Sequence, residues 1–143
     1  TVVLDGAHNE EKTSALITAL RQMFGQRRLI LVLGMLEAKA VEPIVEKLAA
    51  IADTVIATYP RVKGKPALPA GELVALAKKA GVRQALAEEM PLDALERALE
   101  IAGPDDLVVV TGSLYLIGMV RSHWHSTAEI VSQRTMFPNG FPT

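Results

Sequence analysis

The sequence of 143 residues contains no cysteine, which excludes a disulfide framework and a thiolate metal site. Aromatic residues make up only 4% of the chain, and no cluster of lysine and arginine is interleaved with them. The formal net charge is -1, whereas a nucleic-acid-binding domain usually presents a strongly basic face. We therefore expect no nucleic-acid partner.

Long apolar runs are also missing. No run approaches the ~18 residues that a membrane-spanning helix needs, and the N-terminus lacks the basic region of a signal peptide. We expect a cytoplasmic monomer without a membrane partner. The chain starts on an apolar strand without a methionine, so we also expect it to be a piece of a longer protein.

Apolar runs and helical patterns alternate along the whole chain. Apolar runs predict strands, and an apolar stripe with a period near 3.6 predicts helices. The predicted strands cover 2–4, 28–33, 54–58, 83–88 and 107–111, and the predicted helices cover about 10–25, 41–52, 70–80, 91–102 and 113–124. This order predicts an α/β fold, a Rossmann-like three-layer sandwich with a mostly parallel sheet and helices on both faces.

Chemically useful side chains follow the first strand at once. Val2, Val3 and Leu4 predict a strand buried on both faces, and Asp5-Gly6-Ala7-His8-Asn9 comes directly after it. Open α/β sheets bind ligands at the carboxyl ends of their strands, so this segment predicts a ligand site. The helix that follows is expected to bury a stripe that contains Leu16, Leu20, Met23 and Phe24.

Asp5-Gly6-Ala7-His8-Asn9 resembles the motif that opens the C-terminal domain of folylpolyglutamate synthases, which belong to the Mur ligase superfamily. The segment Val108–Gly118, with Gly112-Ser113-Leu114-Tyr115 at a strand-to-helix junction, resembles a motif near the end of that domain. The two motifs stand in the family's order, about a hundred residues apart. The resemblance covers residues 1–124, taken here as the domain, and leaves 125–143 as a tail of undetermined structure.

The resemblance implies an ATP-dependent ligase that adds L-glutamate to folate through an acyl phosphate, with dihydrofolate synthase activity as an open alternative. No Gly-x-x-x-x-Gly-Lys-Ser/Thr loop, which wraps phosphates and positions Mg²⁺, occurs in the chain. In the resembled enzymes this loop and the metal ligands lie in the preceding ATPase domain. We therefore expect ATP and Mg²⁺ as cofactors, that domain as a partner, no metal ligand here and no turnover by this chain alone.

Three residues of the first motif receive nucleotide-binding roles from the resemblance. Asp5 is expected to contact ATP. Its structural alternative is that the carboxylate only accepts hydrogen bonds from backbone N–H groups of the loop. His8 is expected near the phosphates or the reacting centre, where an imidazole can carry positive charge near neutral pH. Asn9 is first a helix cap and second a ligand contact. Glu10 and Glu11 in the first turn would repel a phosphate, which favours a ribose or adenine contact here.

Two further residues are expected near the substrates. Ser113 matches the family's serine beside the glutamate co-substrate, and its structural alternative is a plain helix cap. Lys39 matches a family lysine that would touch an anion across the cleft, but Ala38 and Ala40 replace the flanking aspartates. Pro66 stands where the family often has arginine, and Lys65 is an alternative source of that charge. Tyr115 is expected to serve packing.

Two other functions stay open. Another Mur-type ligase of cell-wall synthesis would share the chemistry, but its opening motif usually has tyrosine where this chain has Gly6. A receiver-like signalling module would need an aspartate at the end of the third strand, where this chain has Thr58-Tyr59, and a lysine after the fifth, where Gly112-Ser113 stands.

Overall fold

The computed structural model describes residues 1–38, 40–126 and 128. Within this part of the chain, five parallel strands form one sheet in the order β1-β5-β2-β3-β4. They are β1 (Val2–Leu4), β2 (Leu29–Leu33), β3 (Thr54–Ala57), β4 (Gln84–Ala87) and β5 (Leu107–Thr111). The predicted parallel sheet is confirmed, and the predicted strand ends are correct to within a few residues.

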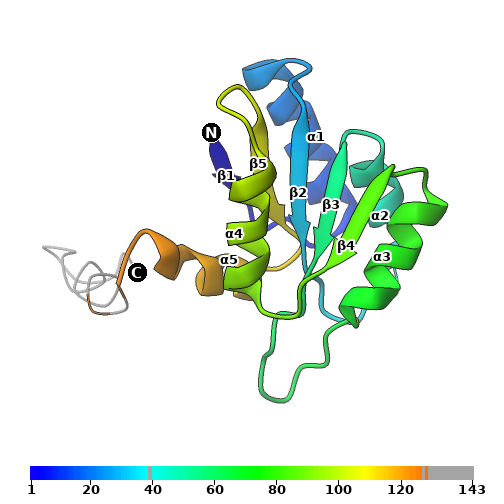
Figure 1. Cartoon of the computed structure of the whole chain (residues 1–143). Coiled ribbons are helices and arrows are strands. Elements are labelled where there is room, and N and C mark those ends of the chain that lie inside the picture. The colour runs from blue at the N-terminus through cyan, green and yellow to red at the C-terminus, as the bar shows by residue number, and fades with distance from the viewer. Residues whose placement is uncertain (39, 127, 129–143) are drawn as a thin grey trace, which may run out of the picture.

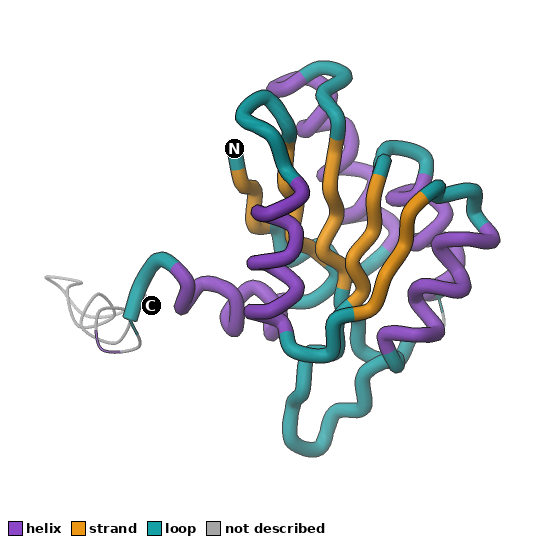
Figure 2. The backbone as a smooth tube through the Cα atoms, viewed as in Figure 1, coloured by secondary structure: helices purple, strands orange, loops and turns teal. Residues whose placement is uncertain are grey.

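Helices cover both faces of this sheet, as Figures 1 and 2 show. One face carries α1 (Glu10–Phe24), α2 (Val41–Ala49) and α3 (Ala70–Lys79), and the other carries α4 (Pro91–Ile101) and α5 (Leu114–Val120). A short 3-10 helix, η1 (Arg121–His123), continues α5. The three-layer α/β sandwich is thus confirmed. None of the helices described here is long and apolar enough to cross a membrane.

Two apolar clusters, one on each side of the sheet, form the core. The central strand β2 is buried along its whole length and alternates between them: Leu29, Leu31 and Leu33 face the α1–α3 side, while Ile30 and Val32 face the α4–α5 side. Burial on both faces explains why this strand is a continuous apolar run rather than an alternating one.

Strand β1 differs from its prediction in burial. Val2, Val3 and Leu4 do form a parallel strand, but each is only half-buried. The strand lies at the edge of the sheet and pairs with β5 alone, so one of its sides has no neighbouring strand to cover it. The prediction of full burial was therefore wrong, because an apolar run does not distinguish an edge strand from a central one.

Helix α1 also buries a slightly different stripe from the predicted one. Leu16 and Leu20 are buried and Phe24 packs against the same cluster, as predicted, but Met23 is 72% exposed. Thr13, which was not in the predicted stripe, is buried. A helix turns by about 100° per residue, so the inner face passes through Leu20 and Phe24 and leaves Met23 beside it. The tail predicted at 125–143 lies almost wholly outside the described residues.

The connections leave the carboxyl edge of the sheet in opposite directions. The chain leaves β1 toward α1 on one face and leaves the neighbouring β5 toward α5 on the other face. Divergence of this kind opens a crevice between adjacent strand ends, which is where open α/β sheets bind ligands. In Figure 1 this edge lies at the bottom, beside the long loop that joins β3 to α3.

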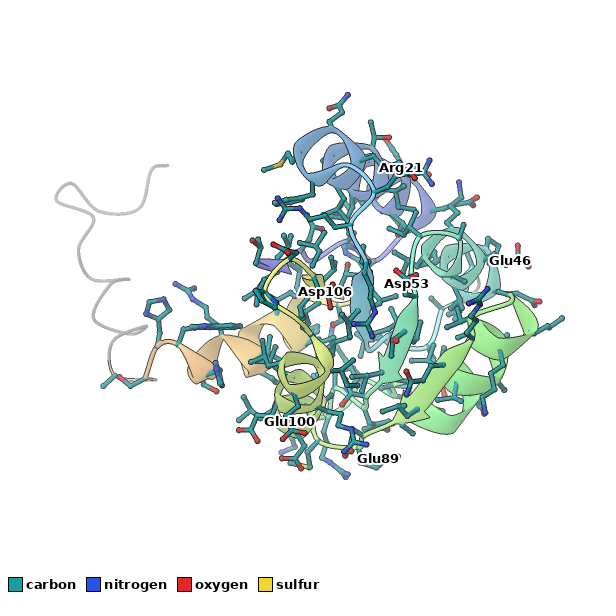
Figure 3. All side chains as sticks on the ribbon, turned by 45° about the horizontal axis from the view of Figure 1, so that its top comes forward. Arg21, Glu46, Asp53, Glu89, Glu100 and Asp106 are labelled. Atoms are coloured by element: carbon teal, nitrogen blue, oxygen red, sulfur yellow. The ribbon has the colours of Figure 1, made fainter. Side chains whose placement is uncertain are left out.

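The opposite, amino-terminal edge is held by acidic side chains. The Asp53 carboxylate accepts a hydrogen bond from the Leu29 N–H at 2.8 Å, and the Asp106 carboxylate accepts from the Gly103 N–H at 2.8 Å and from the Arg28 guanidinium at 2.7 Å. Figure 3, in which this edge comes forward, shows Asp53 and Asp106 near the starts of the central strands. Asp53 therefore fixes the start of the neighbouring strand β2, and Asp106 fixes the turn before β5.

Truncation of a fully buried side chain should strongly destabilise the fold. Leu95 in α4 is 0% exposed within the α4–α5 cluster, whereas Leu92 on the same helix is 40% exposed. We expect Leu95→Ala to lower the free energy of unfolding by about 2–5 kcal/mol in urea titrations, through lost burial and a residual cavity. Leu92→Ala is the matched control and should change it by less than about 1 kcal/mol. Equal losses in both variants would contradict the placement of α4.

The Asp106 turn should make stability depend on pH. The hydrogen bond from the Gly103 N–H, with help from Arg28, lowers the pKa of the Asp106 carboxyl from its ordinary 3.8. A lowered folded-state pKa stabilises the protein above pH 3.8, and this contribution is lost as the pH falls through the folded value. We expect Asp106→Asn to be less stable than the wild type near neutral pH, with the difference shrinking in acid. Asp105→Asn, an exposed neighbour, is the control in the same thermal unfolding series.

Candidate functional site

Hydrogen bonds to two backbone carbonyls, those of Ala7 and Thr111, join the segments that follow β1, β5 and β2. The Ala7 carbonyl accepts from the Gly112 N–H at 3.1 Å and from the Thr111 hydroxyl at 3.3 Å. The Gly34 N–H in turn donates to the Thr111 carbonyl at 3.4 Å. Three segments that are far apart in the sequence therefore meet in one rigid strand-end junction.

Glycine at position 112 makes this junction possible. Gly112 has φ +114°, a conformation that L side chains rarely adopt. A Cβ atom at this position would also collide with the Gly34 carbonyl oxygen, while Leu33 and Met35 side-chain atoms lie 3.0 Å away. The backbone conformation and the close Gly34 carbonyl therefore require glycine at position 112, before Ser113 of the second motif.

Asp5 closes a tight turn at the end of β1. Its Oδ1 atom accepts from the Ala7 N–H at 2.8 Å, while its own N–H continues the ladder to the Val110 carbonyl at 3.0 Å. The structural interpretation of Asp5 is therefore correct for one carboxylate oxygen. Among the described residues this is the only hydrogen bond of the carboxylate, so Oδ2 remains an acceptor for a ligand hydroxyl.

His8 stands exposed at the tip of the same loop. Its Nδ1 atom lies 3.0 Å from the Gly6 carbonyl oxygen, which can only accept, so Nδ1 carries the proton. The Nε2 atom is then directed away from this contact, as an acceptor in the neutral ring and as a donor in the protonated one. The loop therefore presents one ring nitrogen for a ligand.

Asn9 and Ser113 are both helix caps. The Asn9 Oδ1 atom accepts from the Lys12 N–H at 2.8 Å at the start of α1. The Ser113 Oγ atom accepts from the Tyr115 N–H at 3.1 Å at the start of α5, and Ser113 is only 3% exposed. The capping interpretation is confirmed for both residues, and their ligand contacts stay predictions.

Two hollows flank this junction and share one wall. The first, of about 410 Å³, is lined by Asp5 and by Lys12 and other residues of the first half of α1. The second, of about 310 Å³, is lined by Ser113, Tyr115 and the loop after β2. His8 and Leu114 line both hollows. His8 therefore stands on the boundary between two adjacent spaces.

The outer wall of the second hollow comes from two paired loops. The Glu37 N–H donates to the Pro66 carbonyl at 3.0 Å, and the Leu68 N–H donates to the Met35 carbonyl at 2.9 Å. Lys65 follows a tight turn in the second loop and lines the hollow. The segment 59–69, which contains Pro60, Gly64, Pro66 and Pro69, thus forms only isolated bridges, but it is held against the site.

Sequence reasoning missed two of the residues that line the hollows. Tyr115 was expected to pack, but this residue is 41% exposed, and the centroid of its ring lies 5.2 Å from the Lys65 Nζ atom. Leu114 is 66% exposed and lies over Gly6, where a Cβ atom would meet its side chain. The available signal was their position just after the Ser113 cap, because the first turn of a helix at this edge faces the site. Lys39 lies outside the described residues.

Charges around the site do not form a metal centre. Within the described residues, no group of three or more histidine, aspartate or glutamate side chains is placed to hold a metal ion. Glu10 in the first turn of α1 is partly neutralised by Lys47, whose Nζ atom lies 3.5 Å from its Oε1 atom. This ion pair weakens the repulsion that was expected between the first turn and a phosphate.

Comparison with known proteins identifies the chain's family. The family model described as Mur ligase, glutamate ligase domain, matches residues 1–114. The chain belongs to this family. A folylpolyglutamate synthase from Lacticaseibacillus casei is 37% identical over 124 residues, which are 84% of this chain and 26% of that protein. The resemblance seen in the two sequence motifs is thereby confirmed.

Solved structures agree with this result. Mycobacterium tuberculosis folylpolyglutamate synthase, complexed with ADP and AMPPCP, has a TM-score of 0.76 and 30% identity, over 86% of this chain and 29% of that one. A bifunctional folylpolyglutamate synthase/dihydrofolate synthase from Yersinia pestis, complexed with AMPPNP and a Mn ion, has a TM-score of 0.74 and 25% identity, over 87% and 28%.

The chain corresponds to only a part of each of these relatives. The chain spans between a quarter and a third of the length of these relatives. All three relatives are named as folylpolyglutamate synthases. The comparisons favour neither the cell-wall ligase nor the receiver-like module. The chain therefore corresponds to the glutamate ligase domain of the Mur ligase family and to only part of these longer proteins.

The strand-end junction should not tolerate a side chain at Gly112. We expect Gly112→Ala to lower the free energy of unfolding by about 1–3 kcal/mol or more, because it adds backbone strain and a clash with the Gly34 carbonyl. Gly118→Ala is the matched control, since Gly118 lies inside α5 with open space around it. The control should gain up to about 1 kcal/mol from better helix propensity. Urea unfolding of the two variants tests this, and a Gly112→Ala variant as stable as the wild type would contradict it.

Proposed function

We propose that this chain is the C-terminal domain of a folylpolyglutamate synthase, an ATP-dependent ligase that adds L-glutamate to folate. The proposal rests on the position of His8, which lies between two hollows at the carboxyl edge of the sheet. The membership of the chain in this ligase family supports it. A ligase must bring a nucleotide and a second substrate into contact at one point, and this wall offers such a point.

The reaction proceeds in two steps. ATP transfers its γ-phosphoryl group to the folate carboxylate, which gives an acyl phosphate and ADP. The glutamate amine then attacks the acyl carbon and loses a proton. The amide bond forms as the bond from the acyl carbon to the bridging oxygen breaks, and inorganic phosphate leaves with that bridging oxygen. An acyl phosphate hydrolyses in water, so the site has to be closed while this intermediate exists.

In this proposal the nucleotide occupies the hollow beside Asp5. Asp5 keeps one carboxylate oxygen on the Ala7 N–H and offers Oδ2 to a ribose hydroxyl. Lys12 lines the same hollow and adds a positive charge for the nucleotide. Asn9 positions this loop through its cap on α1, and contacts the nucleotide only in addition.

His8 is then placed between the nucleotide and the second substrate. Its Nδ1–H contact with the Gly6 carbonyl orients the ring, and Nε2 faces the reacting groups. A protonated ring would stabilise the charge that develops on the transferred phosphoryl group. Ser113, on the other side of the wall, and Lys39 in the neighbouring loop are proposed to contact glutamate.

The ATPase domain of the same ligase supplies what this chain lacks. The phosphate-wrapping loop is absent from the sequence, and the described residues do not fit a Mg²⁺ site. Mg²⁺ would offset the negative charge of the nucleotide phosphates, and we propose that its ligands come from the partner domain. We propose that the carboxyl edge of this domain closes over the nucleotide held there, in the cytoplasm, and that the isolated chain has no turnover.

Glutamate-dependent release of ADP tests the proposed function. The full-length protein that carries this chain with its P-loop domain is incubated with ATP, Mg²⁺, a reduced folate and L-glutamate. We expect ADP release only when folate and glutamate are both present, and a product heavier by one glutamyl residue. Release that depends on dihydropteroate would add dihydrofolate synthase activity. Release that needs a different acceptor would contradict the folate assignment.

The role of Asp5 is tested by a substitution that preserves its turn. An asparagine retains an oxygen for the Ala7 N–H but loses the charge, so Asp5→Asn separates ligand contact from loop structure. We expect the KM for ATP to rise about tenfold or more, since hydrogen bonds to charged groups contribute about 1.5–3 kcal/mol. Asp105→Asn, on the opposite edge of the sheet, should leave it unchanged. An unchanged KM for ATP in Asp5→Asn would restrict Asp5 to the turn.

A further inference from the structure

Four arginines gather at the amino-terminal edge of the sheet, which the proposed reaction does not use. Arg21, Arg27 and Arg28 line a hollow of about 480 Å³, and Arg28 and Arg83 line a neighbouring hollow of about 530 Å³. We propose that these four residues, the arginine edge, bind a small multiply charged anion that reaches across both hollows with carboxylate or phosphate groups. This inference goes beyond the proposed function and does not depend on it.

The strand order brings the arginines together. Arg28 directly precedes β2 and Arg83 directly precedes β4, with β3 between these two strands. Because neighbouring strands lie about 4.8 Å apart, the two backbone positions are about 10 Å from each other. Arg21 in the last turn of α1 and Arg27 in the loop after it extend the row on the side of that helix. Figure 3 shows Arg21 and Asp53 at this edge.

Three of these guanidinium groups have no acidic partner. None of the ion pairs within the described part of the chain includes Arg21, Arg27 or Arg83. Arg28 donates to the Asp106 carboxylate at 2.7 Å through Nη1, and since a guanidinium has five N–H donors, others stay available. The place of Arg21 in the last turn also complements the dipole of α1, and this role uses none of its donors.

Two of the arginines are held in position by the protein. The Arg27 Cζ atom lies 5.6 Å from the centroid of the Phe24 ring, within the ~6 Å range of a cation–π contact, and Arg28 is held by Asp106. A side chain that is already restrained loses less conformational freedom when it binds a ligand. The planar fork of a guanidinium matches the paired oxygens of a carboxylate or a phosphate. The arrangement therefore suits an oxyanion.

The loop between α1 and β2 adds backbone donors above an apolar floor. Among the described residues, no acceptor is bound by the N–H groups of Gln26, Arg27 and Arg28, which all line the first hollow. Leu29 and Leu107 line the same hollow and are 4% and 2% exposed. Walls of low polarity strengthen the attraction between an ion and the charges that face it.

An aspartate at the same edge limits which anion fits. Asp53 lines both hollows, and its carboxylate repels an anion placed beside it, although Oδ2 accepts the Leu29 N–H at 2.8 Å. The four arginines outnumber Asp53 and Asp106, so this edge is positive in a chain whose formal net charge is -1. An anion that contacts several arginines on both sides of Asp53 is therefore favoured over a single phosphate or carboxylate.

Titration of the ¹⁵N-labelled chain with two probes tests the site by NMR. The probes are inorganic tripolyphosphate and an N-acetylated trimer of L-glutamate, at about 0.15 M salt, where the Debye length is about 8 Å and distant charges are screened. We expect shifts of the Gln26, Arg27 and Gln84 amides with at least one probe. A larger response to tripolyphosphate identifies phosphate as the recognised group, and a larger response to the trimer identifies carboxylate. No shifts with either probe, or shifts confined to residues 5–9 at the carboxyl edge, would refute the site.

Substitutions in each hollow test whether one ligand spans both. Arg27→Gln and Arg83→Gln should each raise the Kd of the bound probe about threefold or more, and the double variant about tenfold or more. Arg27→Lys keeps the charge without the fork and should fall between the wild type and Arg27→Gln. Arg97→Gln, at an exposed position of α4 outside both hollows, is the matched control and should keep the wild-type Kd. A wild-type Kd in Arg83→Gln would refute the spanning ligand, and an equal loss in Arg97→Gln would refute a defined site.

Discussion

The candidate site depends on one backbone carbonyl. The Ala7 oxygen accepts hydrogen bonds from the Gly112 N–H and the Thr111 hydroxyl, and so ties the loop after β1 to the end of β5. Ala7 itself is 4% exposed, so these bonds form in an environment with little competing water. Asp5 and His8 on one side and Ser113 on the other owe their relative positions to this junction.

The acidic side chains at the two edges of the sheet differ in whether they are paired within the protein. At the amino-terminal edge the carboxylates of Asp53 and Asp106 accept hydrogen bonds from backbone N–H groups, and Asp106 also accepts from Arg28. At the carboxyl edge Asp5 keeps one oxygen available, and Lys65 and Glu37 line a hollow and form no ion pair with any other described residue. Charges that a fold leaves uncompensated at a strand-end crevice are the ones with which it can bind ligands.

The sequence predicted the architecture and the two helix caps beside the candidate site. Apolar runs located the five strands, because strands buried on both faces need no alternation, and the caps at Asn9 and Ser113 follow from residue type. An apolar run does not show which strand lies at the edge of a sheet, so the burial of β1 was overestimated. The contact between Lys65 and Tyr115 joins residues 50 positions apart (115 minus 65), and no local pattern reports such a pair.

The order of the strands has a consequence for synthesis. Of the five strands that the structure describes, β5 is the last to be made, yet it lies between β1 and β2, the first two. Until it arrives, β1 has no partner strand and one side of β2 has an open row of hydrogen-bonding groups, which invites pairing with other chains. A nascent chain therefore carries its first motif on an unpaired strand, and the ligand site is assembled only when the final strand inserts.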